Sequence, residues 1–157
     1  MATVDFNPVA DRLRIIGSDG TNLRANVDDG KVVTDGKLKF AEADANKAAT
    51  PMVVSGAYTN SMKGAKDTAL YNIDGGLGGV VKQAPPNDGV LNTIGMTGVK
   101  AKSLAFDILS DGNGGNTAFL MADETLHTVD LAKGTATPAV TISGAKGVRD
   151  IAILPAM

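Results

Sequence analysis

Residues 126–136, Leu-His-Thr-Val-Asp-Leu-Ala-Lys-Gly-Thr-Ala, decide the fold class of this chain. Side chains alternate in two sets from Leu126 to Leu131, which is typical of a β-strand with one buried face. A turn at Lys133 and Gly134 follows, and then a Thr- and Val-rich run to Ile142. The stretch therefore predicts a strand, a turn and a second strand. The same order recurs along the chain about every 45–50 residues, as in a propeller-like β-array.

Four similar short segments mark this repeat, and each of the first three is followed by sequence that predicts three more strands. We therefore expect one all-β domain over residues 1–157, a partial β-propeller of about three four-stranded blades plus one extra C-terminal strand. Three blades are too few to close a ring, because closed propellers have about four to eight. The segments are residues 4–8, 56–60, 104–108 and 148–153; the blades span approximately 3–50, 51–98 and 99–144, and the closing strand 148–154.

Asp-Gly pairs separate many of the predicted strands. Such pairs supply the positive φ that tight hairpin turns require. They occur at Asp19-Gly20, Asp29-Gly30, Asp35-Gly36, Asp74-Gly75, Asp88-Gly89 and Asp111-Gly112.

One segment departs from the strand pattern. Residues 39–49 are rich in helix formers and are followed by Thr50 and Pro51, where a helix would end. We expect an inter-blade loop there with about two helical turns. The recurring apolar positions of the repeat predict the buried core, which should include Phe6, Ile15, Tyr58, Leu70, Phe106, Phe119, Val129 and Ile151.

The composition limits the classes of function. The formal net charge is −2, from 15 Lys and Arg against 17 Asp and Glu, and the basic residues are scattered. We therefore expect no nucleic-acid partner, because such proteins usually carry a basic stripe. The chain has no cysteine, which excludes disulfides and thiolate metal sites. It has no apolar run of the length that spans a bilayer and no secretory signal at its start, so we expect no membrane insertion.

Four polar residues on neighbouring predicted strands form the first candidate site. They are Arg12, Arg14, Asn22 and Arg24. Arginine offers a bidentate fork, so the four could line a pocket for an anionic or sugar ligand. The same spacing fits a cross-strand ladder of ion pairs and amides without any ligand, and we favour that interpretation.

Four oxygen-bearing residues on the repeated first strand form the second candidate site. They are Asp5, Asn7, Asn60 and Asp107. The first strand of a propeller blade lines the central channel, and carboxylate and amide oxygens are ligands that Ca²⁺ prefers. The alternative, which we favour, is that these side chains bond to neighbouring backbone groups. Apart from this possible Ca²⁺ we expect no cofactor.

Several motifs together resemble a bacterial family that is itself a domain of unknown function. Its first pattern is carried here by residues 4–16, which begin Val-Asp-Phe-Asn-Pro, and by Thr21-Asn22-Leu23-Arg24-Ala25-Asn26. Residues 58–60, 70–74 and 85–91 continue the likeness, and residues 148–153 are similar to its last repeat. The resemblance covers nearly the whole chain. It implies a β-propeller-like fold and an extracellular or cell-surface location, and it transfers no catalytic residue.

We expect a non-enzymatic structural or interaction module. The single histidine, His127, lies in a predicted strand, and no nucleophile motif of the Gly-x-Ser-x-Gly kind accompanies it. The unpaired closing strand favours self-association into a closed ring or a filament, so the expected partner is another copy of the chain. The alternative is a metal-dependent lactonase- or hydrolase-like propeller enzyme that uses the channel carboxylates.

Overall fold

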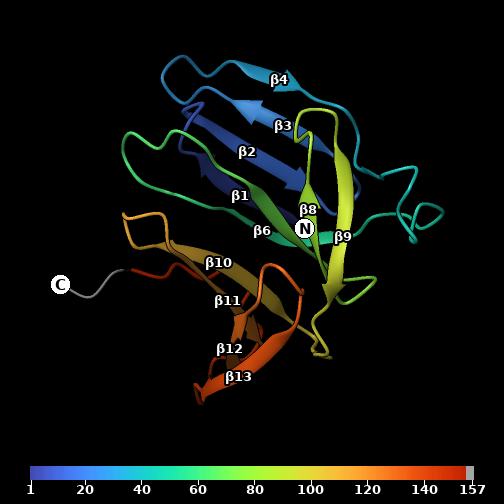
Figure 1. Ribbon diagram of the computed structural model, residues 1–157, viewed down its shortest axis with the longest axis vertical. Helices are drawn as coiled ribbons and strands as arrows, with labels where there is room; N and C mark the ends of the chain where they lie inside the picture. Colours follow the sequence, from blue (N-terminus) through green and yellow to red (C-terminus); the bar gives the residue numbers. More distant parts are fainter. Residues whose placement is uncertain (155–157) are drawn as a thin grey trace.

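The chain folds into three sheets, as seen in a computed structural model that describes residues 1–154 (Figure 1). The all-β expectation is confirmed: there are thirteen strands, and no helix occurs within the described part of the chain. The sheets contain four, five and four strands, and none closes on itself. In sequence order they take up residues 2–34, 39–96 and 104–141.

The first sheet is an antiparallel meander, and its strand order follows the sequence. Its register places Asp5 opposite Arg14 and Arg14 opposite Arg24, so polar side chains line up across three strands. The strands are β1 (Ala2–Asn7), β2 (Arg12–Gly17), β3 (Asn22–Ala25) and β4 (Val32–Thr34).

The second sheet has one strand more than predicted, in the order β5-β9-β8-β7-β6. The added strand is β5 (Lys39–Phe40), which pairs parallel to β9. The others are β6 (Val53–Tyr58), β7 (Leu70–Asp74), β8 (Gly79–Gln83) and β9 (Val90–Met96).

The helical turns expected at residues 39–49 are wrong. After β5 the segment forms successive tight turns instead of a helix. The Asp44 carboxylate accepts the backbone N–H of Asn46 at 2.8 Å and that of Thr93 in β9 at 2.6 Å. These bonds fasten the loop to the sheet and override the local preference for a helix.

The third sheet contains the stretch that decided the fold class. It is an antiparallel meander of β10 (Leu104–Ser110), β11 (Asn116–Ala122), β12 (Thr125–Val129) and β13 (Ala136–Thr141). The predicted strand, turn and strand are confirmed within one to two residues. Asp130 makes the turn, because its Oδ1 accepts the N–H groups of Ala132 at 2.9 Å and Lys133 at 3.1 Å.

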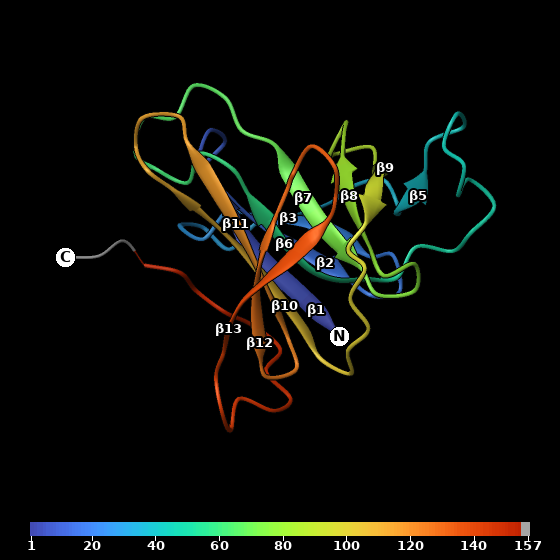
Figure 2. The same cartoon turned by 60° about the horizontal axis from the view of Figure 1, so that its bottom comes forward.

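β1, β6 and β10 each begin an antiparallel meander of four strands, and we call them the first strands. They lie side by side, with β6 between β1 and β10 (Figures 1 and 2). Side chains bridge from each of these strands to the next. Thr3 Oγ1 accepts the Gly56 N–H at 3.1 Å, and Ser55 Oγ accepts the Phe106 N–H at 2.8 Å. Two apolar clusters fill the space between sheets, one joining the first and second and the other joining the second and third.

The closing strand expected at residues 148–154 is wrong. Residues 151–154 lie outside any sheet, and β10 remains an edge strand. One hydrogen bond ties them to the third sheet, from the Ile153 N–H to Asp107 Oδ2 at 2.6 Å. A strand requires a partner that takes up its alternate backbone groups, and the rest of residues 1–154 supplies none here.

The predicted core is confirmed in part, with four of its eight residues buried. Tyr58, Leu70, Phe106 and Val129 are buried, and Ile15, Phe119 and Ile151 are half-buried. The prediction for Phe6 is wrong, because 43% of this residue is exposed. It lies on β1, the only one of the three bridging strands with no sheet before it in the described chain.

Candidate functional site

Arg14 is the centre of a buried polar cluster that the first two sheets build together. It lies on β2 and its side chain is 3% exposed. Its Nη1 donates to Asn22 Oδ1 at 2.8 Å and to Asp35 Oδ2 at 2.6 Å. Its Nη2 donates to Asn87 Oδ1 at 2.7 Å, and its Nε to the Tyr58 hydroxyl at 3.2 Å. All three guanidinium nitrogens therefore already have acceptors within the protein.

Asp35 is the counter-ion of this cluster, and its side chain is 5% exposed. Arg24 donates two hydrogen bonds to the Asp35 carboxylate, from Nε to Oδ2 at 2.7 Å and from Nη2 to Oδ1 at 2.8 Å. Burial by itself would raise the pKa of Asp35, but the bonds from Arg24 and Arg14 outweigh it and lower the pKa. The bidentate geometry is the one in which arginine holds carboxylates most strongly.

Amide side chains extend the cluster toward the second sheet. Asn22 Nδ2 donates to the carbonyls of Gly36 and Pro86, each at 3.0 Å. Gln83 Nε2 donates to the same Pro86 carbonyl at 2.8 Å. These contacts fix the 84–89 turn of the second sheet against the end of the first. The cluster thus works as a joint between two sheets.

Sequence reasoning identified only part of the cluster. Arg14, Asn22 and Arg24 lie in the cluster, whereas Arg12 donates its Nη1 to the Asp11 carbonyl at 2.6 Å. Ligand binding by these four residues stays a prediction. The partners that the sequence did not single out as site residues are Asp35, Tyr58, Gln83 and Asn87. The sequence marks Asp35 only as the first residue of an Asp-Gly turn. Its position directly after a predicted strand is the one sequence feature that could have identified it as a site residue.

The side-chain oxygen of Asn72, buried beside the cluster, has no hydrogen-bond partner among residues 1–154. Its Nδ2 donates to Gln83 Oε1 at 3.0 Å. The oxygen faces Gly56 of the neighbouring strand, where a Cβ would overlap it. Residue 56 must therefore be glycine for β6 and β7 to keep this side chain between them.

The two acids of the second candidate site accept backbone N–H groups. Asp5 accepts the N–H of Phe6 at 2.8 Å through Oδ1 and that of Tyr58 at 2.6 Å through Oδ2. Asp107 repeats the arrangement, with the N–H of its own neighbour Ile108 at 2.8 Å on Oδ1 and that of Ile153 on Oδ2. Burial raises the pKa of Asp5, and the two backbone bonds partly oppose that effect.

The two asparagines of this candidate site also bond within the protein. Asn7 Oδ1 accepts the N–H groups of Val9 and Ala10 at 2.9 and 2.8 Å, which caps the turn after β1. Asn60 Nδ2 donates to Asp67 Oδ1 at 2.6 Å, and Asn60 Oδ1 accepts from Asn116 at 2.8 Å. Across residues 1–154, no group of three or more His, Cys, Asp or Glu side chains is placed to hold a metal ion. Calcium binding stays a prediction.

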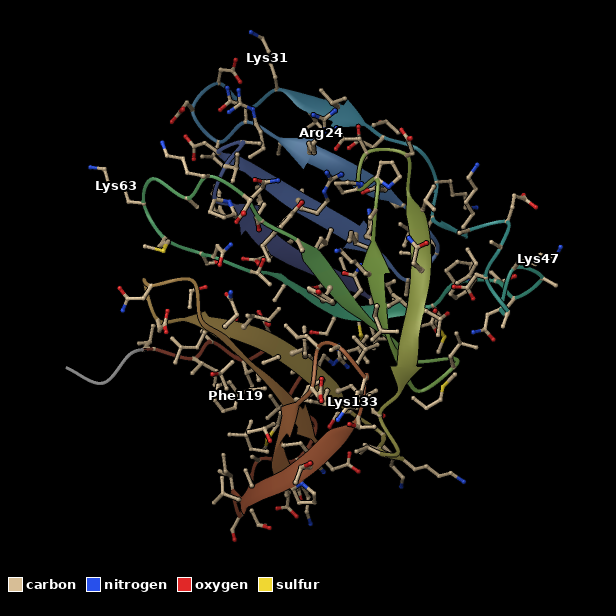
Figure 3. All side chains as sticks on the ribbon, viewed as in Figure 1. Arg24, Lys31, Lys47, Lys63, Phe119 and Lys133 are labelled. Carbon is tan, nitrogen blue, oxygen red and sulfur yellow. The ribbon has the colours of Figure 1, made fainter. Side chains whose placement is uncertain are left out.

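Three of the basic side chains, Lys31, Lys47 and Lys63, extend from three separate loops (Figure 3). The expectation that no nucleic acid binds stays a prediction. In the part of the chain described here, no helix has the length and apolar character needed to cross a membrane.

Comparisons with known proteins agree with the motifs. The search of curated proteins found no match. The sequence model of a family described as a domain of unknown function (DUF4394) matches residues 1–152. That range includes both candidate sites and all three sheets. The chain therefore belongs to the DUF4394 family of domains of unknown function.

Proposed function

We propose that this protein is a non-enzymatic structural or interaction module that self-associates, and that its three sheets are blades of a partial β-propeller. The supporting observation is an unequal burial of equivalent strands. Tyr58 on β6 and Phe106 on β10 are 1% and 2% exposed, because a preceding sheet covers them. On β1 the corresponding face is open, with Phe6 43% exposed and Val4 50% exposed.

Such an open apolar face favours association, since burial removes its side chains from water. Contacts between copies that close give a ring, and contacts that do not close give a filament. Both outcomes belong to the proposal.

The polar chemistry also favours a structural role. The guanidinium group of Arg14 donates its hydrogen bonds to side chains of the protein, and the carboxylates of Asp5 and Asp107 accept backbone N–H groups. Groups that are already satisfied internally offer little to a substrate. An extracellular or cell-surface location forms part of the proposal and rests on the family resemblance.

Sedimentation velocity across a wide range of protein concentration tests self-association. We expect the weight-average mass to rise with concentration, and a mass that stays at one chain throughout would refute the proposal. Thermal unfolding with Ca²⁺ and with a chelator tests the remaining role of the acids. A structural module should melt at the same temperature in both, whereas a metal-dependent enzyme should melt higher with the metal.

A further inference from the structure

The bridging bonds between sheets define equivalent residues on the three first strands. Thr3 on β1 bonds to Gly56 on β6, and Ser55 on β6 bonds to Phe106 on β10 in the same way. Val4 of β1, Gly56 and Phe106 are therefore equivalent. Two residues further on, Phe6, Tyr58 and Ile108 are equivalent by the same count. Each of these strands thus has one side that faces the preceding sheet, which we call the receiving side, and one side that faces the following sheet.

The receiving side of β1 is empty within the described chain. The Tyr58 N–H donates across to Asp5 Oδ2 at 2.6 Å, whereas the N–H groups of the equivalent Phe6 and Ile108 donate to Oδ1 of their own neighbours Asp5 and Asp107, each at 2.8 Å. Burial separates these two residues, since Ile108 is 3% exposed and Phe6 is 43% exposed. The face built from Val4 and Phe6, which we name the receiving face, continues an interface already formed twice inside the molecule.

The opposite end of the molecule has the complementary group. Asp107 on β10 is the equivalent of Asp5, and its Oδ2 accepts the Ile153 N–H at 2.6 Å, which repeats the Asp5–Tyr58 bond. Residues 151–154 therefore occupy the position of a following first strand without forming one. Leu154 is 81% exposed, so this end of the segment packs on little.

We propose that the receiving face binds the third sheet of a second copy of this chain, whose Asp107 accepts the Phe6 N–H after releasing its own residues 151–153. This inference rests on the proposed self-association and specifies its geometry. A second copy is the fitting occupant because its third sheet carries Asp107, the equivalent of Asp5, and the interface between β1 and β6 already pairs such an acid with the backbone N–H of a neighbouring first strand. The contact is head-to-tail, so the C-terminal segment competes with the incoming copy.

Two valines allow a matched test of the receiving face. Val4 on β1 and Val33 on β4 are each 50% exposed and lie on the two edge strands of the same sheet. We expect V4E to weaken self-association at least about tenfold, because it places a charge in a buried apolar contact, and V33E to change it by less than about twofold. Circular dichroism and thermal unfolding check that both variants fold. Should V4E not fold, V4S against V33S gives the same comparison.

The substitution I153P tests the competing segment in the full chain. Proline has no N–H, so Asp107 Oδ2 loses its present donor and becomes available to another copy. We expect I153P to tighten self-association about tenfold, the worth of one hydrogen bond to a charged group, and V4E combined with I153P to abolish that gain. Unchanged or weaker association in I153P overturns the competition.

The outcomes separate the two proposals. A wild type and an I153P variant that are both monomeric at every concentration refute self-association itself. Association that V4E and V33E affect equally, or that only V33E weakens, overturns the head-to-tail contact and leaves self-association standing.

Discussion

Two glycines with the same backbone conformation differ sharply in their surroundings. Gly30 and Gly89 each follow an aspartate, and their φ values are 71° and 68°. Nothing lies within 4 Å of the position that a Cβ on Gly30 would take. A Cβ on Gly89 would overlap the Gly36 carbonyl oxygen and lie 2.6 Å from that of Lys37. Alanine at the two positions therefore separates backbone strain from close packing.

The expected magnitudes follow from these contacts. Left-handed backbone costs a residue other than glycine about 1–2 kcal/mol, and both variants carry this cost. At Gly89 the two chain segments must also move apart. That movement weakens the bonds from Gly36 N to Asn87 O at 2.8 Å and from Lys39 N to Gly89 O at 2.9 Å, each worth about 1 kcal/mol. We therefore expect a loss of about 1–2 kcal/mol for G30A and about 3–4 kcal/mol for G89A.

Urea unfolding followed by circular dichroism measures both losses against the wild type. The midpoints should fall in the order wild type, G30A, G89A, with similar slopes, since the fold is the same in all three. Equal losses in the two variants would show that the 36–39 and 87–91 segments do not pack as described. A larger loss for G30A would contradict the reasoning altogether.

The other predictions concern the bridges, the polar cluster and the core. T3V should cost about 1–2 kcal/mol in urea unfolding, because the Gly56 N–H loses its acceptor while the shape is kept. D35N should cost about 3 kcal/mol at pH 7, since it leaves buried arginine unpaired. The pKa of Asp35 is lowered in the folded state, so its contribution to the free energy of unfolding is complete above the unfolded-state pKa of about 3.9 and disappears as the pH falls through the folded-state pKa. The difference in unfolding free energy between wild type and D35N should therefore narrow in that pH range. F106A should cost about 3–5 kcal/mol and F6A less than about 1 kcal/mol, because Phe106 is buried and Phe6 is 43% exposed; equal costs would contradict the difference in burial.

The sequence by itself determined most of the strands, the turns and the family. The alternation of His127, Val129 and Leu131 with Thr128 and Asp130 predicted β12, because a half-buried strand needs one buried face. Of the six Asp-Gly pairs, those ending at Gly20, Gly30, Gly89 and Gly112 have positive φ, as their turn role predicts. These features depend on residues close in the chain, and local physics is enough to specify them.

Contacts between distant segments were decided only by the tertiary structure. The sequence identified Arg14 and Arg24 as candidates. Their acceptors Asp35 and Asn87 come from turns far apart in the chain, and no local sequence pattern predicts that these turns lie together. The helix-forming residues 39–49 became β5 and a string of turns because Asp44 bonds to β9. Phe6 is exposed because no sheet of the described chain covers it, and residues 151–153 form no strand because no strand of the described chain pairs with them.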